Sequence, residues 1–276
     1  MTTTVRRPIR DDRVLTSTRA LSVAIIPFLV VAFIDLYFWP HDTNRFFAWT
    51  IKPGLTPMIL GSVYLGGAYF FYRAARATEW HQIKGGFIPV ASFASLMGVA
   101  TALHWEKFNN SHVAFWLWVG LYFTTPFLVF AAWLTNRRYD AALAAGEPLL
   151  AQRVANLIAA VGVLAVVTSA FLFLLPNRAI AIWPWLLTPL TARVMGAIFV
   201  LGVSAVGALF ERRASAARLM VRVATVMLTL IAVGAARGRN DIDGSNALTW
   251  VFAVGFVAVL GGCVVLLVRA PSARTR

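Results

Sequence analysis

The stretch that decides the fold is residues 154–175, VANLIAAVGVLAVVTSAFLFLL, which contains no charged side chain. Crossing the hydrocarbon core of a bilayer takes about 20 mostly apolar residues in a helix. Residues 247–268 form a second run of this kind. Because a bilayer offers no hydrogen-bond partners to the backbone, each run predicts a transmembrane α-helix.

Six further runs have the length and hydropathy of a span, although Pro57, Arg193 and Arg222 lie near the ends of three of them. The eight predicted spans are residues 21–39, 55–72, 87–103, 113–134, 154–175, 190–210, 219–236 and 247–268. The composition agrees, since 59% of the residues are hydrophobic and only 13% are charged. A water-soluble protein has too little polar surface at that composition to cover its apolar residues. The predicted fold class is an all-α polytopic helical membrane protein with about eight transmembrane helices.

The net charge of +14 does not indicate nucleic-acid binding, because the 25 Lys and Arg residues form small groups between apolar runs. If both termini are cytoplasmic, 18 of these 25 residues fall in inner segments and 7 in outer segments. Such an excess is what the positive-inside rule predicts. We therefore expect a bacterial plasma membrane protein with a cytoplasmic N-terminus and a cytoplasmic C-terminus.

The two halves of the chain share short motifs at a constant spacing. Leu55-Thr56 matches Leu190-Thr191 at an offset of 135 residues, and Trp116 matches Trp250 at an offset of 134. Chance similarity between apolar helices is the alternative explanation. A repeat predicts a cytoplasmic segment (1–20), a first four-helix unit (21–138), a cytoplasmic linker (139–153), a second unit (154–268) and a cytoplasmic tail (269–276).

Polar residues that could carry chemistry gather at the predicted outer ends of the spans. His104 and Glu106 follow the third span, His112 precedes the fourth, and His41 follows the first. Imidazole and carboxylate groups suit a divalent metal such as zinc or manganese, and two histidines can also ligate haem. The alternative is a polar loop at the water interface, so no cofactor is expected by default.

Asp35 lies about one turn inside the outer end of the first span. A carboxylate within a span costs several kcal/mol unless it is paired or wetted, so such residues often mark proton or cation sites. Asp35 could instead reach water or pair with Arg45. Arg193, near the outer end of the sixth span, could be its partner from the other half or could extend to the headgroups.

Several functional classes lack their sequence signatures. The single cysteine, Cys263, excludes an intrachain disulfide. The chain has no phosphate-binding Gly-Lys-Ser/Thr loop, no His-Glu-x-x-His helix and no Gly-x-Ser-x-Gly motif. These absences argue against ATP-driven transport and several hydrolase classes, and they favour a protein that is not an enzyme.

The run FFAWTIKP at residues 46–53, followed by Leu55-Thr56 and Gly61, resembles uncharacterised multi-pass membrane proteins of high-GC actinobacteria. The resemblance is clearest over residues 38–67. It implies a lineage and a membrane fold, and it carries no assigned activity, cofactor or site residue.

The leading functional prediction is a transporter or permease with an outward-facing polar vestibule. One alternative is a membrane enzyme or redox protein with a metal or haem at the outer face. Another is a structural subunit of a membrane complex. The expected partners are the lipid bilayer and either a second copy of the chain or another membrane subunit, with no nucleic acid.

Overall fold

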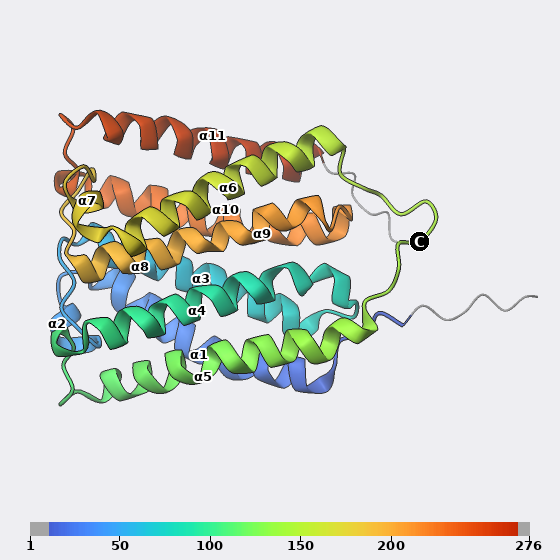
Figure 1. The fold of residues 1–276 in the computed structure, drawn as a ribbon, viewed down its shortest axis with the longest axis horizontal. Coiled ribbons are helices and arrows are strands. Elements are labelled where there is room, and N and C mark those ends of the chain that lie inside the picture. Colours follow the sequence, from blue (N-terminus) through green and yellow to red (C-terminus); the bar gives the residue numbers. More distant parts are fainter. Residues whose placement is uncertain (1–10, 270–276) are drawn as a thin grey trace, which may run out of the picture.

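A computed structural model describes residues 11–269, and these residues form a bundle of long helices with no strand (Figure 1). Seven of the helical segments are long and apolar enough to cross a membrane. They are α1 (Thr16–Phe38), α4 (Lys84–Leu103), α5 (Val113–Asn136), α6 (Gln152–Leu174), the segment from α8 (Pro189–Phe199) to η5 (Gly207–Leu209), α10 (Ala214–Arg237) and α11 (Ala247–Arg269).

The remaining long helix is α3 (Leu55–Arg76), which matches the second predicted span. It is less apolar because it contains three tyrosines and three glycines and ends in Arg73 and Arg76. Most of its residues are buried against other helices, so they contact protein rather than lipid. The chain is therefore a polytopic helical membrane protein with about eight spans.

Two predicted spans begin several residues after the start of the helices that contain them. α4 begins at Lys84 rather than at residue 87, and α10 begins at Ala214 rather than at residue 219. Lys84 in α4, and Ser215 and Arg218 in α10, carry these helices beyond their apolar parts. The sixth predicted span is also not one regular α-helix, because it contains the 3₁₀ turns η4 (Val200–Gly202) and η5 on either side of α9 (Val203–Val206).

The two halves of the chain contain the same elements at a nearly constant spacing. α1 begins at Thr16 and α6 at Gln152, 136 residues later. α5 begins at Val113 and α11 at Ala247, and the short turn η2 (Trp105–Lys107) corresponds to η6 (Arg239–Asp241), both at a difference of 134.

Equivalent hydrogen bonds follow the same spacing. Trp116 Nε1 donates to the Asn110 carbonyl at 3.0 Å, and Trp250 Nε1 donates to the Gly244 carbonyl at 3.1 Å. In the same loops, Ser111 Oγ donates to Asn109 Oδ1 at 2.7 Å, and Ser245 Oγ donates to Asp243 Oδ1 at 2.6 Å. The loops before α5 and α11 therefore have the same local structure.

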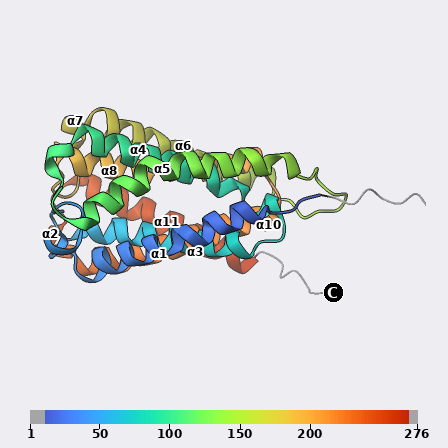
Figure 2. The ribbon, with the colours of Figure 1, turned by 90° about the horizontal axis from the view of Figure 1, so that it is seen from below.

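Two helix crossings join the halves. α3 packs against α10, and α4 packs against α8 and the turn that follows it. α3 and α4 have the most buried residues, whereas α10 has few. α5 and α6 lie on one side of the bundle and α1 on the other (Figure 2). The outer helices expose large apolar side chains such as Phe127, Leu164 and Val254, which would face lipid.

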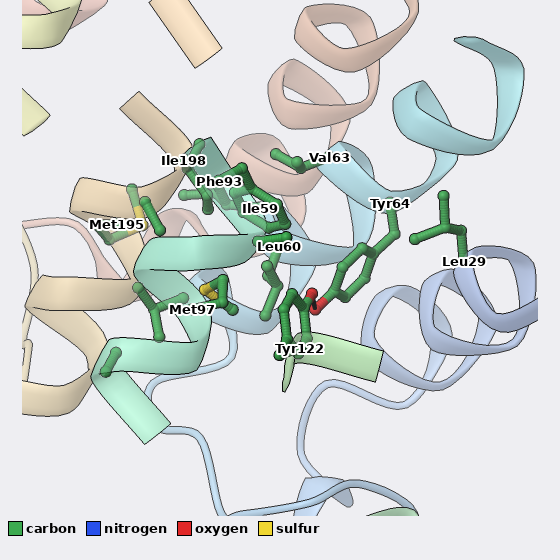
Figure 3. Close-up of a cluster of buried hydrophobic side chains, with 14 of the residues drawn as sticks. Leu29, Ile59, Leu60, Val63, Tyr64, Phe93, Met97, Tyr122, Met195 and Ile198 are labelled. Carbon is green, nitrogen blue, oxygen red and sulfur yellow. Dashed lines mark hydrogen bonds between the residues drawn. The ribbon is translucent and has the colours of Figure 1, made fainter. Parts of the chain in front are cut away.

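The side chains at the centre of the bundle come from both halves (Figure 3). Leu60 and Tyr64 of α3 lie beside Met97 of α4 and Tyr122 of α5, and Met195 and Ile198 of α8 reach the same cluster. The hydroxyl groups of Tyr64 and Tyr122 are hydrogen-bonded to each other at 2.7 Å. Each buried hydroxyl thus has a partner, as a low-dielectric interior requires.

α5 and α11 occupy equivalent positions but are held differently. Asn136, at the end of α5, is fully buried; its amide oxygen accepts from the Leu15 N–H and the Thr18 hydroxyl, and its amide nitrogen donates to the Arg13 carbonyl. These bonds fasten α5 to the segment before α1. In the described part of the chain, α10 is the only helix against which α11 packs extensively, and no residue of the α11 span is buried.

The first and last described residues lie at the same end of the bundle (Figure 1). The loops 77–83, 140–151 and 210–213 lie at this end, and loops 39–54, 104–112, 175–188 and 238–246 at the other. Because the first end is predicted to be cytoplasmic, we call it the inner end and the opposite one the outer end.

The crossing of α6 with α9 depends on Gly162. A Cβ atom there would lie 2.6 Å from the Gly202 carbonyl oxygen and 2.7 Å from the Val206 nitrogen. We expect Gly162→Val to lower the free energy of unfolding by about 1–3 kcal/mol through overpacking. Gly255→Val on α11 is the matched control, because no heavy atom lies within 4 Å of its Cβ position. Thermal unfolding in detergent measures both variants, and equal midpoints would contradict the assignment.

Candidate functional site at the outer end

Arg193 and His104 are the two predicted site residues that the structure brings together. Arg193 is the fifth residue of α8, and His104 directly follows α4. The Arg193 Nη1 atom lies 2.6 Å from His104 Nε2. A guanidinium group has donors only, so His104 Nε2 must accept this bond. The imidazole is therefore neutral, with its proton on Nδ1.

The Arg193 guanidinium has no carboxylate partner in the described part of the chain. Its Nε atom is buried and also lacks a hydrogen-bond partner there. Arg193 is half-buried, and a partly buried cation without a counter-ion is costly because it has lost water without gaining an opposite charge. The pair thus consists of a cation hydrogen-bonded to a neutral base, and Arg193 can still take an anion as its counter-ion.

The surroundings of His104 favour its neutral form. Burial lowers the pKa of His104 most, the positive charge of Arg193 lowers it further, and Lys107 lowers it slightly. The negative charge of Glu106, an exposed residue, opposes these effects. The net result is a pKa below the ordinary histidine value, so a proton binds here only at lower pH or with an accompanying anion.

The equivalent position in the other half has no polar pair. Arg193 corresponds to Met58 at an offset of 135, and His104 corresponds to Gly238 at an offset of 134. A Cβ atom on Gly238 would lie 3.1 Å from the Met58 Cε atom, so these two residues are also in contact. The same helix crossing is therefore built elsewhere in this chain from apolar groups, and packing alone does not require arginine and histidine.

Below His104, polar side chains continue toward the centre of the bundle. Thr101, one turn earlier on α4, accepts from Trp118 Nε1 at 2.9 Å and donates to the Met97 carbonyl at 2.8 Å. The ring of Trp118 lies 4.3 Å, centroid to centroid, from the ring of Tyr122, whose hydroxyl group bonds Tyr64. Polar groups thus extend from the outer end to the buried tyrosine pair.

The structure does not join Asp35 to this pair. Asp35 is half-buried on α1, and its carboxylate has no ion pair in the described part of the chain, either with Arg45 or with Arg193. Arg193 takes His104 as its partner instead. A role of Asp35 in proton or cation binding stays a prediction.

The remaining predicted ligands are placed apart. His41 packs its ring against Gly54 at the start of α3, where a Cβ atom would lie 2.6 Å from the ring. His112 Nδ1 accepts from the Ala114 N–H at 3.2 Å and so caps α5. Within residues 11–269, no three His, Cys, Asp or Glu side chains gather in a way that could hold a metal ion. The predicted metal or haem site at His41, His104, Glu106 and His112 gains no support from this arrangement.

One group of polar residues escaped the sequence analysis. At the inner end, His81 is hydrogen-bonded to both Asp12 and Ser215. Their separations in the chain are 69 and 134 residues, so no local motif contains them. The only signal was the repeat, because His81 and Ser215 are equivalent positions at its 134-residue offset.

The state of His104 predicts a pH dependence of stability. Because the folded-state pKa lies below the unfolded value of about 6.5, the folded protein binds fewer protons, and the contribution of His104 to stability is present above that pH. It is lost as the pH falls from about 6.5 through the folded-state pKa. We expect the thermal midpoint of the wild type to fall more than that of His104→Gln, whose amide oxygen can still accept from Arg193. Identical pH profiles of the two proteins would contradict this.

No protein-family model matches this chain, and no curated protein or solved structure matches it either. The resemblance over residues 38–67 stays a prediction for that reason. Its structure alone therefore describes the chain: it is a polytopic helical membrane protein in which Arg193 and His104 are in contact between the two halves at the outer end.

Proposed function

We propose that this protein is a transporter or permease of the bacterial plasma membrane that takes up a small oxyanion together with a proton at its outer end. The observation that carries the proposal is the contact between Arg193 and neutral His104, with no carboxylate partner for Arg193 among residues 11–269. The ligand class follows from the donors, because a guanidinium fork matches the oxygen pairs of phosphate and carboxylate groups.

Proton and anion binding are coupled at such a pair. When a proton binds Nε2, His104 can no longer accept from Arg193, and two cations face each other with Lys107 nearby. An oxyanion between them would accept from both and offset their repulsion. Each ligand therefore strengthens the binding of the other by the same factor.

Movement across the bilayer would use the two crossings between the halves. We infer that the halves are four-helix repeats related by an axis along the membrane normal, and the matched helix spacings and loop hydrogen bonds support this. In transporters built from repeats, one unit rocks against the other around a site at their interface. Arg193 and His104 come from different halves, so rocking would open or close the pair.

Orientation is part of the proposal and can be tested separately. Ser111 in an outer-end loop and Ala144 in the inner-end linker are both exposed. In a Cys263→Ala background, we expect a membrane-impermeant maleimide to label Ser111→Cys in intact cells and Ala144→Cys only after lysis. Labelling of Ala144→Cys in intact cells would place the termini outside and reject this orientation.

The transport step is tested in proteoliposomes with inorganic phosphate and a small carboxylate, using an inwardly directed proton gradient. We expect gradient-dependent uptake that falls about tenfold or more in Arg193→Met, since a hydrogen bond to a charged group contributes about 1.5–3 kcal/mol. We expect this variant to fold, because Met58 occupies the corresponding position in the proposed repeat. Arg178→Met is the matched control, because it removes an exposed outer-end arginine that lies on α7 (Pro176–Ile180).

A binding measurement separates a failed site from a failed transporter. With oxyanion bound, the pKa of His104 followed by NMR should rise by about one unit or more in the wild type and not in Arg193→Met. A rise without any uptake would reject transport and keep the site. No rise with either anion would reject the site itself.

A further inference from the structure

A second cluster of reactive groups lies at the inner end of the same interface. His81, in the turn η1 (Trp80–Gln82), lies between Asp12, which precedes α1, and Ser215, the second residue of α10. His81 Nε2 is 2.9 Å from Ser215 Oγ, and His81 Nδ1 is hydrogen-bonded to the Asp12 carboxylate. The second oxygen of Asp12 accepts from the His81 backbone N–H at 3.2 Å.

The order of these bonds fixes the role of each group. With the imidazole proton on Nδ1 and held by Asp12, Nε2 accepts from the Ser215 hydroxyl. Nucleophile, base and orienting carboxylate are thus connected in the order that activates a serine. Asp12 and His81 are buried, with 8% and 2% of their surface exposed, whereas Ser215 is exposed. Ser215 is therefore accessible from the surroundings, while its base is shielded from water.

The start of α10 adds donors beside the hydroxyl group. The Ala214 N–H donates to the Pro148 carbonyl, and the Arg213 N–H donates to Glu211 Oε1. In the described part of the chain, no acceptor is bonded to the N–H groups of Ser215 and Ala216. Unpaired N–H groups in the first turn of a long helix stabilise negative charge. Such donors serve as an oxyanion hole when they lie next to a nucleophile.

Two further carboxylates lie near the base. Glu147 Oε1 lies 3.7 Å and Glu79 Oε2 3.9 Å from His81 Nε2. Arg213, which is buried, lies 3.7 Å from the second oxygen of Glu147 and so holds that carboxylate in place. When the serine proton moves to Nε2, the imidazolium formed has Asp12 on one side and these carboxylates on the other.

We propose that Ser215 is the nucleophile of an acyl-transfer site at the inner end, with His81 as its general base and Asp12 as the residue that positions His81. The substrate class is an acyl ester. This inference rests on residues that the proposed transport does not use.

The reaction balances without an added cofactor. Ser215 Oγ bonds to the carbonyl carbon, its proton moves to His81 Nε2, and the carbonyl electron pair moves to the oxygen facing the two N–H groups. The tetrahedral species then breaks the bond to the leaving oxygen, which takes the proton from Nε2 and departs as an alcohol. Water attacks the acyl-Ser215 through the same base, releases a carboxylic acid and returns the proton to Oγ.

The test uses the full chain in detergent with a fluorescent fluorophosphonate. Ser215 Oγ displaces fluoride from phosphorus, which leaves a stable adduct that peptide mass spectrometry locates. We expect labelling of the wild type at Ser215 and none at this position in Ser215→Ala. General base catalysis contributes about 10²–10⁴-fold, so labelling should slow at least about a hundredfold in His81→Gln and strongly in Asp12→Asn.

Ser111→Ala, which removes an exposed serine at the outer end, is the matched control and should label as the wild type does. Thermal midpoints confirm that each variant is folded. A folded wild type without an adduct on Ser215 would overturn the proposal, and so would a folded His81→Gln that labels at the wild-type rate. Ser215→Ala should retain phosphate uptake, so the two proposals fail independently.

Discussion

Two helix crossings, α3 on α10 and α4 on α8, hold the halves of this protein together. In a bilayer, lipid tails are as apolar as leucine side chains, so helices associate through close packing and hydrogen bonds rather than through the hydrophobic effect. Gly162 and Gly202 meet this demand within the second half, where their backbones approach each other. The buried tyrosine pair meets it within the first half. All other helices are arranged around these contacts.

Both candidate sites lie where the halves meet, one at each end of the interface. At the outer end, His104 of the first half contacts Arg193 of the second, and at the inner end His81 of the first half contacts Ser215 of the second. In the proposed repeat, His81 and Ser215 are equivalent residues, and a repeat places such residues close to each other near its axis. Differences between the halves then turn a symmetric framework into an asymmetric site, since Asp12 corresponds to Pro148, which offers only its carbonyl oxygen.

The sequence was sufficient for features that depend on local pattern. Apolar runs such as residues 154–175 predicted the spans because helix length and hydropathy are properties of neighbouring residues. Hydropathy is a weaker signal for α3, because its tyrosines and glycines make it less apolar than the other spans. The burial of α3 against other helices explains why that composition is tolerated. The 134-residue offset relates the loop that contains Ser111 to the loop that contains Ser245. The matching hydrogen bonds in these two loops, however, became visible only in the folded chain.

The sequence by itself determined that this chain is a bundle of about eight membrane helices, because the bilayer permits few other ways to pair the backbone N–H and C=O groups of an apolar segment. It also singled out Arg193 and His104 as residues of interest. Only the tertiary structure decided that Arg193 meets His104 rather than Asp35, and that Asp12, His81 and Ser215 form one hydrogen-bonded array. Helix rotation and crossing set these contacts over separations of 69 to 134 residues, and rotation depends on packing between helices rather than on any single run of sequence.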